Sequence, residues 1–395
     1  MKNKVLGSIL LVAGSSIGGG MLAMPITSAG VGFIGISILL VVIWFTMCYT
    51  ALLMVTVYRF NSPSDGFDTL TKKYLGVFGN NLAGISLLFL IYALTAAYIS
   101  GGGSILTSQL QRWFVPEIDP RWGALLFTIL FGGIVSISTR WVDLFSRALF
   151  VIKILFLILL LAILFPFVSE ANLLQLPLEQ GLIFTAIPVV FTSFGFHGSI
   201  PSIVKYLNGD EKKLKQAFIW GSFLPLIIYL LWQFVVLGSF DQLTFMGLLK
   251  SSSGLEGLII SIREMAQTPL IRDAFNVFAA TALGTSFLGV SIGLFDYFMD
   301  WTRNKKQLHH RFIVSLLTFS PPLIFVLFYP QGFILALGYA AIAGVILALL
   351  IPTFLFIKAM QHHQIRIPIW QYFILGFIVV LAMVIIGCQL WVALF

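Results

Sequence analysis

The sequence predicts an all-α integral membrane protein, built as a single domain of eleven transmembrane helices. Hydrophobic residues make up 59% of the 395 residues, charged residues only 10%, and the mean hydropathy is +1.01. Soluble domains carry roughly 25% charged residues, so the composition excludes them. The two cysteines, Cys48 and Cys388, fall inside apolar runs, which excludes a disulfide framework and a Cys-rich metal site.

A search with a window of about 19 residues finds eleven apolar spans. They lie near residues 5–31, 33–57, 81–107, 122–137, 147–168, 182–205, 216–238, 271–299, 312–329, 332–357 and 369–394. Little polar sequence remains between them, so no separate soluble domain is expected.

The distribution of Lys and Arg predicts which side of the membrane each loop faces. If the amino terminus is cytoplasmic, the 23 basic residues gather in inner loops or at inner helix ends, with five exceptions: Arg112, Arg121, Lys250, Arg263 and Arg272. The positive-inside rule requires such an excess, so the carboxyl terminus is expected outside. Topology and anionic lipid then explain the net charge of +8, and no nucleic-acid partner is expected.

A glycine cluster interrupts the first span. Residues 14–20 read Gly-Ser-Ser-Ile-Gly-Gly-Gly. At about 1.5 Å of rise per helical residue, they lie roughly 14–22 Å from Val5, near the centre of a bilayer core about 30 Å thick. Freed backbone N–H and C=O groups are costly there, so a break must be buried in protein or line a cavity.

This segment has two other interpretations. Gly14 and Gly18 have the small-xxx-small spacing that lets helices pack closely without a break, and both explanations can hold in part. Lys2 and Lys4 before an apolar run resemble a secretory signal, but the run is too long and contains Pro25 before any plausible cleavage site. Three consecutive glycines each lower helix propensity by about 1 kcal/mol, which favours a break.

A second interruption lies in the sixth span, where residues 194–199 read Phe-Gly-Phe-His-Gly-Ser. A proline follows each interruption, Pro25 the first and Pro201 the second. Span one enters from inside and span six from outside. Interrupted segments at matching places in oppositely oriented halves indicate an inverted-repeat secondary transporter. We therefore predict one domain over residues 1–395, with repeats over about 5–168 and 182–357 and an extra helix over about 369–394.

The two breaks together predict a site for a zwitterion. A half-helix that starts near residues 18–20 points N–H groups and a partial positive charge at the cavity, which suits a carboxylate. Half-helices that end near residues 13–16 and 191–193 present carbonyls, which suit an ammonium group. Backbone that binds both groups a few ångströms apart matches the head of an amino acid.

Several motifs carry a resemblance to a known family. They are residues 1–8 with 12–25 at the amino terminus, 191–199 in span six, and 285–290 with 293–297 in span eight. Over essentially the whole chain, the sequence resembles the hydroxy and aromatic amino acid permeases of the amino acid, polyamine and organocation superfamily. It looks most like the tyrosine-specific branch, although the motifs are specific to the family more than to one substrate.

The resemblance implies a LeuT-type five-plus-five inverted repeat with broken helices 1 and 6, and proton-coupled import of L-tyrosine. It implies that the N–H groups of Gly18, Gly19 and Gly20 hold the substrate carboxylate, and that carbonyls near residues 15–16 and 191–193 hold the ammonium. The residues expected around the substrate are Ser15, Ser16, Gly18, Gly19, Gly20, Tyr98, Phe191, Thr192, Ser193, Phe194 and His197.

Lys153 is the most informative titratable residue. It lies roughly 9 Å deep in span five by helical rise, where a charge is costly unless it is paired or reaches the interface. One interpretation is a lysine whose ammonium snorkels to the cytoplasmic surface. The resemblance implies another, in which this ammonium replaces a cation beside the first break and its protonation is part of the transport cycle. The set expected for proton coupling is Lys153, Gly14, Ile17, Thr285 and Ser286.

His197 lies in the second break and is the only histidine inside an expected span. A structural histidine bonded to a neighbouring carbonyl is one interpretation. The other is a role in the pocket, as the partner of a substrate hydroxyl or as a second proton site. The rings of Phe191, Phe194 and Phe196 could stack on a phenol or indole. Tyr98 is a further candidate, although core packing is the usual fate of any one ring.

The sequence contains no motif of an enzyme, neither an HExxH zinc site nor an intramembrane Ser/His/Asp set. We expect a transporter in the bilayer of a bacterial inner membrane, with an amino acid as its small-molecule substrate. It is expected to function as a monomer, with no cofactor or metal and with the proton as coupling ion. A tryptophan or serine/threonine permease is the alternative within the family. A passive channel is the alternative of another class, because polar breaks also build filters.

Overall fold

The computed structural model describes residues 4–113, 118–177, 182–251, 255, 257–258, 269–301 and 308–394. Within these ranges the secondary structure is helical and no strand is assigned. Among the described residues, ten helices are long and apolar enough to span a membrane, and a bent pair at the amino terminus adds an eleventh if it is taken as one span. The predicted all-α membrane fold is therefore confirmed.

The first half of the chain supplies five spans. The helices are α1 (Lys4–Ser16), α2 (Gly20–Ser28), α3 (Gly32–Tyr58), α4 (Phe67–Trp113), α5 (Pro120–Ile137) and α6 (Thr139–Leu164), followed by the short η1 (Phe165–Phe167) and α7 (Glu170–Leu173). The pair α1–α2 is bent by 51°.

The second half repeats this order and adds one helix. Its elements are α8 (Leu182–Ser193), η2 (His197–Ser199), α9 (Ile200–Tyr206), α10 (Glu211–Ser239), α11 (Gln242–Ser251), α13 (Pro269–Trp301), α14 (Leu308–Phe328), α15 (Phe333–Val345), the π-helical turn η3 (Ile346–Leu350), α16 (Ile351–His362) and α17 (Ile369–Leu394).

Helix α4 is longer than the expected span at 81–107. Its first turns contain Asp68, Lys72 and Lys73, which lower the hydropathy of the segment but do not stop the helix. At Gly76 the backbone leaves the helical conformation, with a φ of 70° in the left-handed region that glycine adopts without steric cost, so a kink joins two helical stretches within α4. Hydropathy located the apolar part of this helix and missed its polar start.

Side-chain caps fix where several helices begin. Asp119 accepts a hydrogen bond from the backbone N–H of Arg121 at 2.8 Å and begins α5. Asp210 accepts one from the N–H of Lys213 at 3.1 Å and begins α10. Such caps satisfy backbone donors that the first helical turn leaves free, so the turns between spans are set by local sequence.

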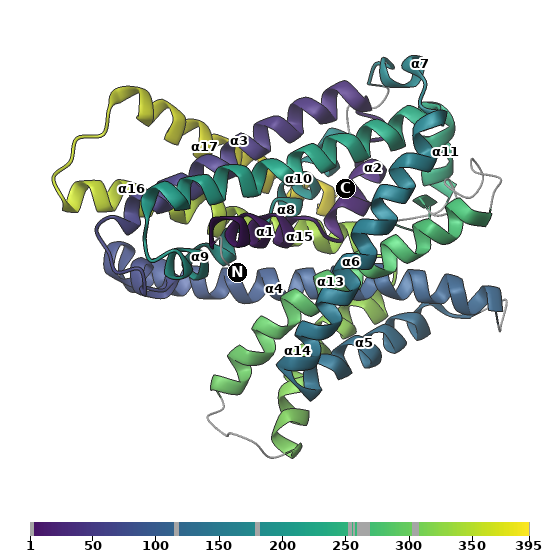
Figure 1. Ribbon diagram of the computed structural model, residues 1–395, viewed down its shortest axis with the longest axis horizontal. Helices are drawn as coiled ribbons and strands as arrows, with labels where there is room; N and C mark the ends of the chain where they lie inside the picture. Colours follow the sequence, from purple (N-terminus) through teal and green to yellow (C-terminus); the bar gives the residue numbers. More distant parts are fainter. Residues whose placement is uncertain are drawn as a thin grey trace.

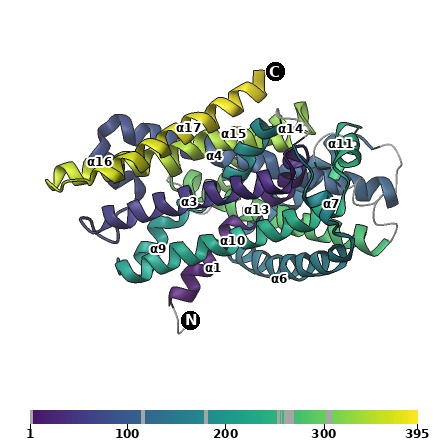
Figure 2. The ribbon, with the colours of Figure 1, turned by 90° about the horizontal axis from the view of Figure 1, so that it is seen from above.

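The packing of the two halves follows one scheme. Helix α13 packs on α6, and α15 packs on α4, so the eighth span meets the fifth as the tenth meets the third. Figure 1 shows α3, α4 and α10 running along the length of the bundle. In Figure 2, α17 lies along one edge and α6 along the opposite edge. The bent pair is held inside, because α1 packs on α10 and α2 packs on α8.

Candidate functional site

The two breaks predicted from the sequence are both present. Helix α1 ends at Ser16 and α2 begins at Gly20, while α8 ends at Ser193 and the next helical turn begins at His197. Because α2 packs against α8, the two breaks adjoin. The ends of four half-helices therefore lie close together in the interior of the bundle.

Glycines allow this close approach. A Cβ atom added at Gly18 would overlap the Ser286 Oγ, and one added at Gly20 would overlap the Ser193 Oγ and lie 3.1 Å from the Ser193 Cβ. One added at Gly19 would lie 2.9 Å from Cε1 of Tyr98. Close packing is therefore present at Gly18 together with the break, whereas an added Cβ at Gly14 would make only an ordinary contact.

The start of α2 keeps free backbone donors. The N–H of Gly19 donates to the Ser286 Oγ at 3.0 Å. In the described part of the chain, the N–H groups of Gly18 and Gly20 have no hydrogen-bond acceptor. Two free N–H groups at the positive end of a helix form a site suited to an anion.

Carbonyls rather than hydroxyls are offered at the helix ends. The Ser15 hydroxyl donates back to the carbonyl of Val12 at 2.8 Å, and the Ser193 hydroxyl to that of Val189 at 2.8 Å. The Ser16 hydroxyl donates weakly to the same Val12 carbonyl at 3.4 Å. The proton of each hydroxyl is used within its own helix, so these side chains have no donor left for a ligand, and the carbonyls at the helix ends stand beside them as acceptors.

The carbonyls of the second break already accept local hydrogen bonds. The Phe191 carbonyl accepts from the N–H of Phe194 at 3.1 Å, and the Thr192 carbonyl from that of Gly195 at 3.2 Å. The Thr192 hydroxyl donates to the carbonyls of Pro188 and, on α15, Leu337. Each carbonyl has a second lone pair, so these groups can still accept from an ammonium.

Lys153 lies beside the first break. Its Nζ donates to the carbonyl of Ile17 at 2.7 Å and to the Thr285 Oγ1 at 3.2 Å, and it lies 4.9 Å from the centre of the Phe150 ring. The side chain is 1% exposed, so the ammonium does not snorkel to a surface. In the described residues no carboxylate pairs with it.

Of the other residues expected to take part in proton coupling, some contact Lys153 and others contact different groups. Thr285 contacts Lys153, whereas Ser286 contacts the backbone of Gly19 instead. Gly14 lies one turn before the break, where an added Cβ would be 3.8 Å from the Phe150 ring. Two consecutive residues of α13 therefore face this region: Thr285 contacts the lysine that binds the break, and Ser286 contacts a glycine of the break itself.

His197 is buried beside the second break. Its Nε2 lies 2.9 Å from the Thr50 Oγ1, and the Thr50 hydroxyl is also 3.1 Å from the Met47 carbonyl. Since the single hydroxyl proton can satisfy that carbonyl, the Thr50 oxygen can accept from Nε2–H. In this tautomer Nδ1 is an acceptor. Nδ1 has no hydrogen-bond partner among the residues that the structure describes.

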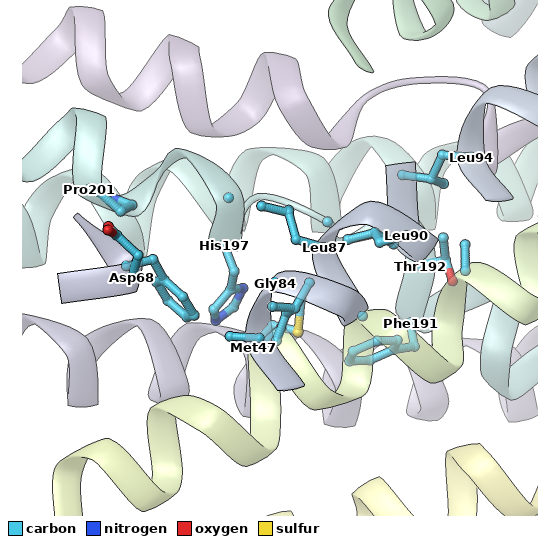
Figure 3. Close-up of a pocket in the computed structure, with 18 of the residues that line it drawn as sticks. Met47, Asp68, Gly84, Leu87, Leu90, Leu94, Phe191, Thr192, His197 and Pro201 are labelled. Atoms are coloured by element: carbon cyan, nitrogen blue, oxygen red, sulfur yellow. The ribbon is translucent and has the colours of Figure 1, made fainter. Parts of the chain in front are cut away.

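A cavity of about 290 Å³ adjoins this histidine, at the lower end of the roughly 300–1,000 Å³ typical of small-molecule sites. Its walls come from α3, α4, the second break and α15–η3. In Figure 3, Asp68 and Pro201 lie at one end, Phe191 and Thr192 at the other, and the His197 ring between them. The walls are mostly apolar.

Other expected pocket residues pack in the core. Tyr98 is 8% exposed and faces Gly19. The Phe194 ring meets the Tyr229 ring edge to face, with 5.1 Å between ring centroids. Phe196 stacks toward Phe218. Of the three phenylalanines by the break, Phe191 alone is among the cavity residues.

Sequence reasoning missed Thr50 and Tyr229. Thr50 sets the hydrogen bonding of His197, and the Tyr229 hydroxyl contacts the carbonyls of Ser16 and Ser193. A signal for Tyr229 exists, because residues 229, 232 and 233 are Tyr, Trp and Gln at helical spacing within an apolar span. For Thr50 no comparable pattern is present.

Two oppositely entering broken helices that meet inside a membrane bundle define a secondary transporter with an inverted repeat. Solved structures agree on the fold. MhsT in complex with L-phenylalanine superimposes with a TM-score of 0.57 at 15% identity, covering 98% of each chain. A manganese transporter of Eremococcus coleocola gives the same TM-score over 97% of this chain and 85% of its own.

Sequence comparisons identify the family. The chain matches the tryptophan/tyrosine permease family over residues 1–392. It is 42% identical to tyrosine-specific transport system 1 of Haemophilus influenzae, over 91% of this chain and 90% of that protein. It is 34% identical to the tryptophan-specific transport protein of the same organism, over 98% and 95%. The chain therefore belongs to the tryptophan/tyrosine permease family, a family of membrane transporters rather than enzymes.

Proposed function

We propose that this protein is a proton-coupled importer of aromatic amino acids, with L-tyrosine as the preferred substrate. Transport proceeds by alternating access around the two adjoining breaks. The observation that carries the proposal is the buried Lys153 ammonium, bonded to the carbonyl of Ile17 at the first break. We assign the protein to a bacterial inner membrane as a monomer, with the amino terminus in the cytoplasm and the carboxyl terminus outside.

The head of the amino acid would bind to backbone. The free N–H groups of Gly18 and Gly20 suit the carboxylate, and the carbonyls at the ends of α1 and α8 suit the ammonium. Every α-amino acid has this head, so these contacts give affinity without selecting a side chain. Selection must come from the space beyond the second break.

The cavity beside His197 suits an aromatic ring that carries a hydrogen-bond donor. Its apolar walls suit a ring, and Nδ1 is a buried acceptor for which the described part of the chain supplies no donor. The O–H of tyrosine can donate to this nitrogen, whereas phenylalanine has no donor. A site built to hydrogen-bond a substrate group rejects an analogue that lacks it. Tryptophan is the second candidate, because its indole N–H can donate to the same atom.

Protonation of Lys153 would be linked to the shape of the first break. An ammonium has three N–H donors, and two of them reach Ile17 on the break and Thr285 on α13. A neutral amine keeps two donors and gains a lone pair, so it holds the carbonyl less strongly. A proton therefore favours the conformation in which α6 and α13 are tied to the break, and this differential affinity is what a coupling ion requires.

Uptake by purified protein in sealed vesicles tests the proposal. We expect saturable uptake of labelled tyrosine that an inward proton gradient accelerates and an uncoupler abolishes. Unlabelled tyrosine should compete best, tryptophan next, and phenylalanine, serine and threonine weakly. Linear flux that ignores the gradient would indicate a channel. Accumulation driven by a sodium gradient alone would refute proton coupling, and equal competition by serine would refute aromatic selectivity.

A further inference from the structure

Tyr229 on α10 touches both breaks with one atom. Its hydroxyl oxygen lies 2.6 Å from the carbonyl of Ser16 and 2.7 Å from the carbonyl of Ser193, and the side chain has no exposed surface. Ser16 is the last residue of α1 and Ser193 is the last residue of α8. One side chain therefore contacts the carboxyl ends of the half-helices from both repeats.

The Tyr229 hydroxyl has fewer protons to donate than there are carbonyl groups around it. A tyrosine hydroxyl has one proton to donate, yet two carbonyl oxygens lie within hydrogen-bond distance of it. Both carbonyls are at helix carboxyl ends, which carry partial negative charge. A group with more than one donor and a positive charge would satisfy both carbonyls better than the hydroxyl does.

Neighbouring bonds hold the tyrosine in place. One turn further along α10, Trp232 Nε1 donates to the Met21 carbonyl at 3.0 Å, and Gln233 Nε2 donates to the Ser28 Oγ at 2.8 Å. These bonds fasten the same face of α10 to α2. The hydroxyl is thus aimed at the two carbonyls by the packing of a whole helix face.

We propose that the Tyr229 hydroxyl competes with the substrate ammonium for the carbonyls of Ser16 and Ser193. Binding of an amino acid releases the hydroxyl from one or both carbonyls, so α10 senses the occupancy of the site. Tyr229 is then a positioning residue of the ammonium subsite. This inference rests on the proposed function, because the ammonium belongs to the amino acid that is imported.

The competition predicts that a conservative substitution at Tyr229 strengthens the binding of the substrate instead of weakening it. In Tyr229→Phe, two buried carbonyls lose their donor, and the substrate ammonium no longer displaces a hydroxyl. Tyrosine should bind about three- to tenfold more tightly, as expected for one neutral hydrogen bond. The desamino analogue 3-(4-hydroxyphenyl)propanoate has the ring and the carboxylate but no ammonium, so its affinity should not change.

The experiment measures dissociation constants of both ligands for purified wild type and Tyr229→Phe by calorimetry. The ratio of the two constants is the readout, because a general loosening of the fold moves both ligands alike. Tyr92→Phe is the matched control. It removes a hydroxyl that donates to the Leu317 carbonyl at 2.8 Å on another helix pair, and the ratio should stay at the wild-type value.

A second variant should change the affinity for tyrosine in the opposite direction while it keeps the size of the side chain. 4-Aminophenylalanine in place of Tyr229 has two N–H donors, one for each carbonyl, and should weaken tyrosine binding relative to the desamino analogue. An unchanged ratio in both variants, or weaker tyrosine binding in Tyr229→Phe, overturns the inference. Wild-type protein that does not bind tyrosine would instead overturn the proposed function, and the inference with it.

Discussion

The first and second breaks have similar surroundings but different contents. Helices α6 and α13 flank the first, as α15 and α4 flank the second, and each pair packs together. At the first break the space is filled by Lys153 and by side chains that touch the glycines. At the second it is a cavity of about 290 Å³ beside His197. Equivalent positions of a repeat can thus hold a charge in one half and an apolar space in the other.

This contrast suggests a division of labour. The filled break offers the Lys153 side chain, which can carry a proton, and free N–H groups, which suit a carboxylate. The open break offers apolar walls and one buried acceptor, which suit a ring with a donor. Substitutions that affect one break and spare the other can test whether the two roles are separate.

The largest effect is expected from a methyl group added at the first break, the filled break between Ser16 and Gly20; the open break is the second one, between Ser193 and His197. In Gly20→Ala the new Cβ would overlap the Ser193 Oγ, and uptake should fall about 100-fold, since overpacking costs about 1–3 kcal/mol. In Gly198→Ala at the open break, the new Cβ meets nothing within 4 Å, and uptake should stay within about twofold, the range of a near-neutral change. Initial rates of tyrosine uptake at equal expression measure both. Equal loss in the two variants would contradict the contrast between filled and open breaks.

A smaller effect is expected at the acceptor of the cavity. His197→Phe keeps a ring but removes Nδ1, so the KM for tyrosine should rise about tenfold, the upper range for one hydrogen bond. The inhibition constant of phenylalanine, which has no donor, should change little. Competition assays give both values, and a parallel rise for phenylalanine would show that His197 serves packing alone.

The smallest effect is expected at the residue that orients the histidine. Thr50→Val keeps the shape of the side chain but removes the hydroxyl that lies 2.9 Å from His197 Nε2. The ring is then free to adopt the other tautomer, and the KM for tyrosine should rise about threefold, which corresponds to a weakened rather than lost hydrogen bond. An effect as large as that of His197→Phe would mean that Thr50 itself binds the substrate.

Much of the fold could be predicted because it depends on local patterns. Hydropathy located the spans, and residues 14–20 and 194–199 marked the breaks, since a glycine-rich interruption of an apolar helix has few explanations. The start of α4 was missed, because helix continues through Lys72 and Lys73 where hydropathy falls. Local patterns predict where a helix is apolar better than where it ends.

The contacts between helices were less predictable. The rotation of a helix about its axis is not fixed by one sequence, so the partners of Tyr229 and Thr50 could not be deduced. Lys153 was an exception, because the family resemblance implied its place beside the first break, whereas its depth in the span alone also allowed a lysine that snorkels to the surface. Phe194 and Phe196 show that closeness to a break in the sequence does not place a ring in the pocket, since both pack against core rings.

The division of labour is tested most directly by Lys153→Ala in vesicles, with tyrosine exchange and tyrosine accumulation measured in the same preparation. Exposed Lys358→Ala on α16 is the matched control and should behave as wild type. We predict that Lys153→Ala loses accumulation driven by a proton gradient but retains exchange between equal pools of tyrosine, with its preference over phenylalanine intact. Accumulation that persists in Lys153→Ala, or a loss of that preference, would contradict the account.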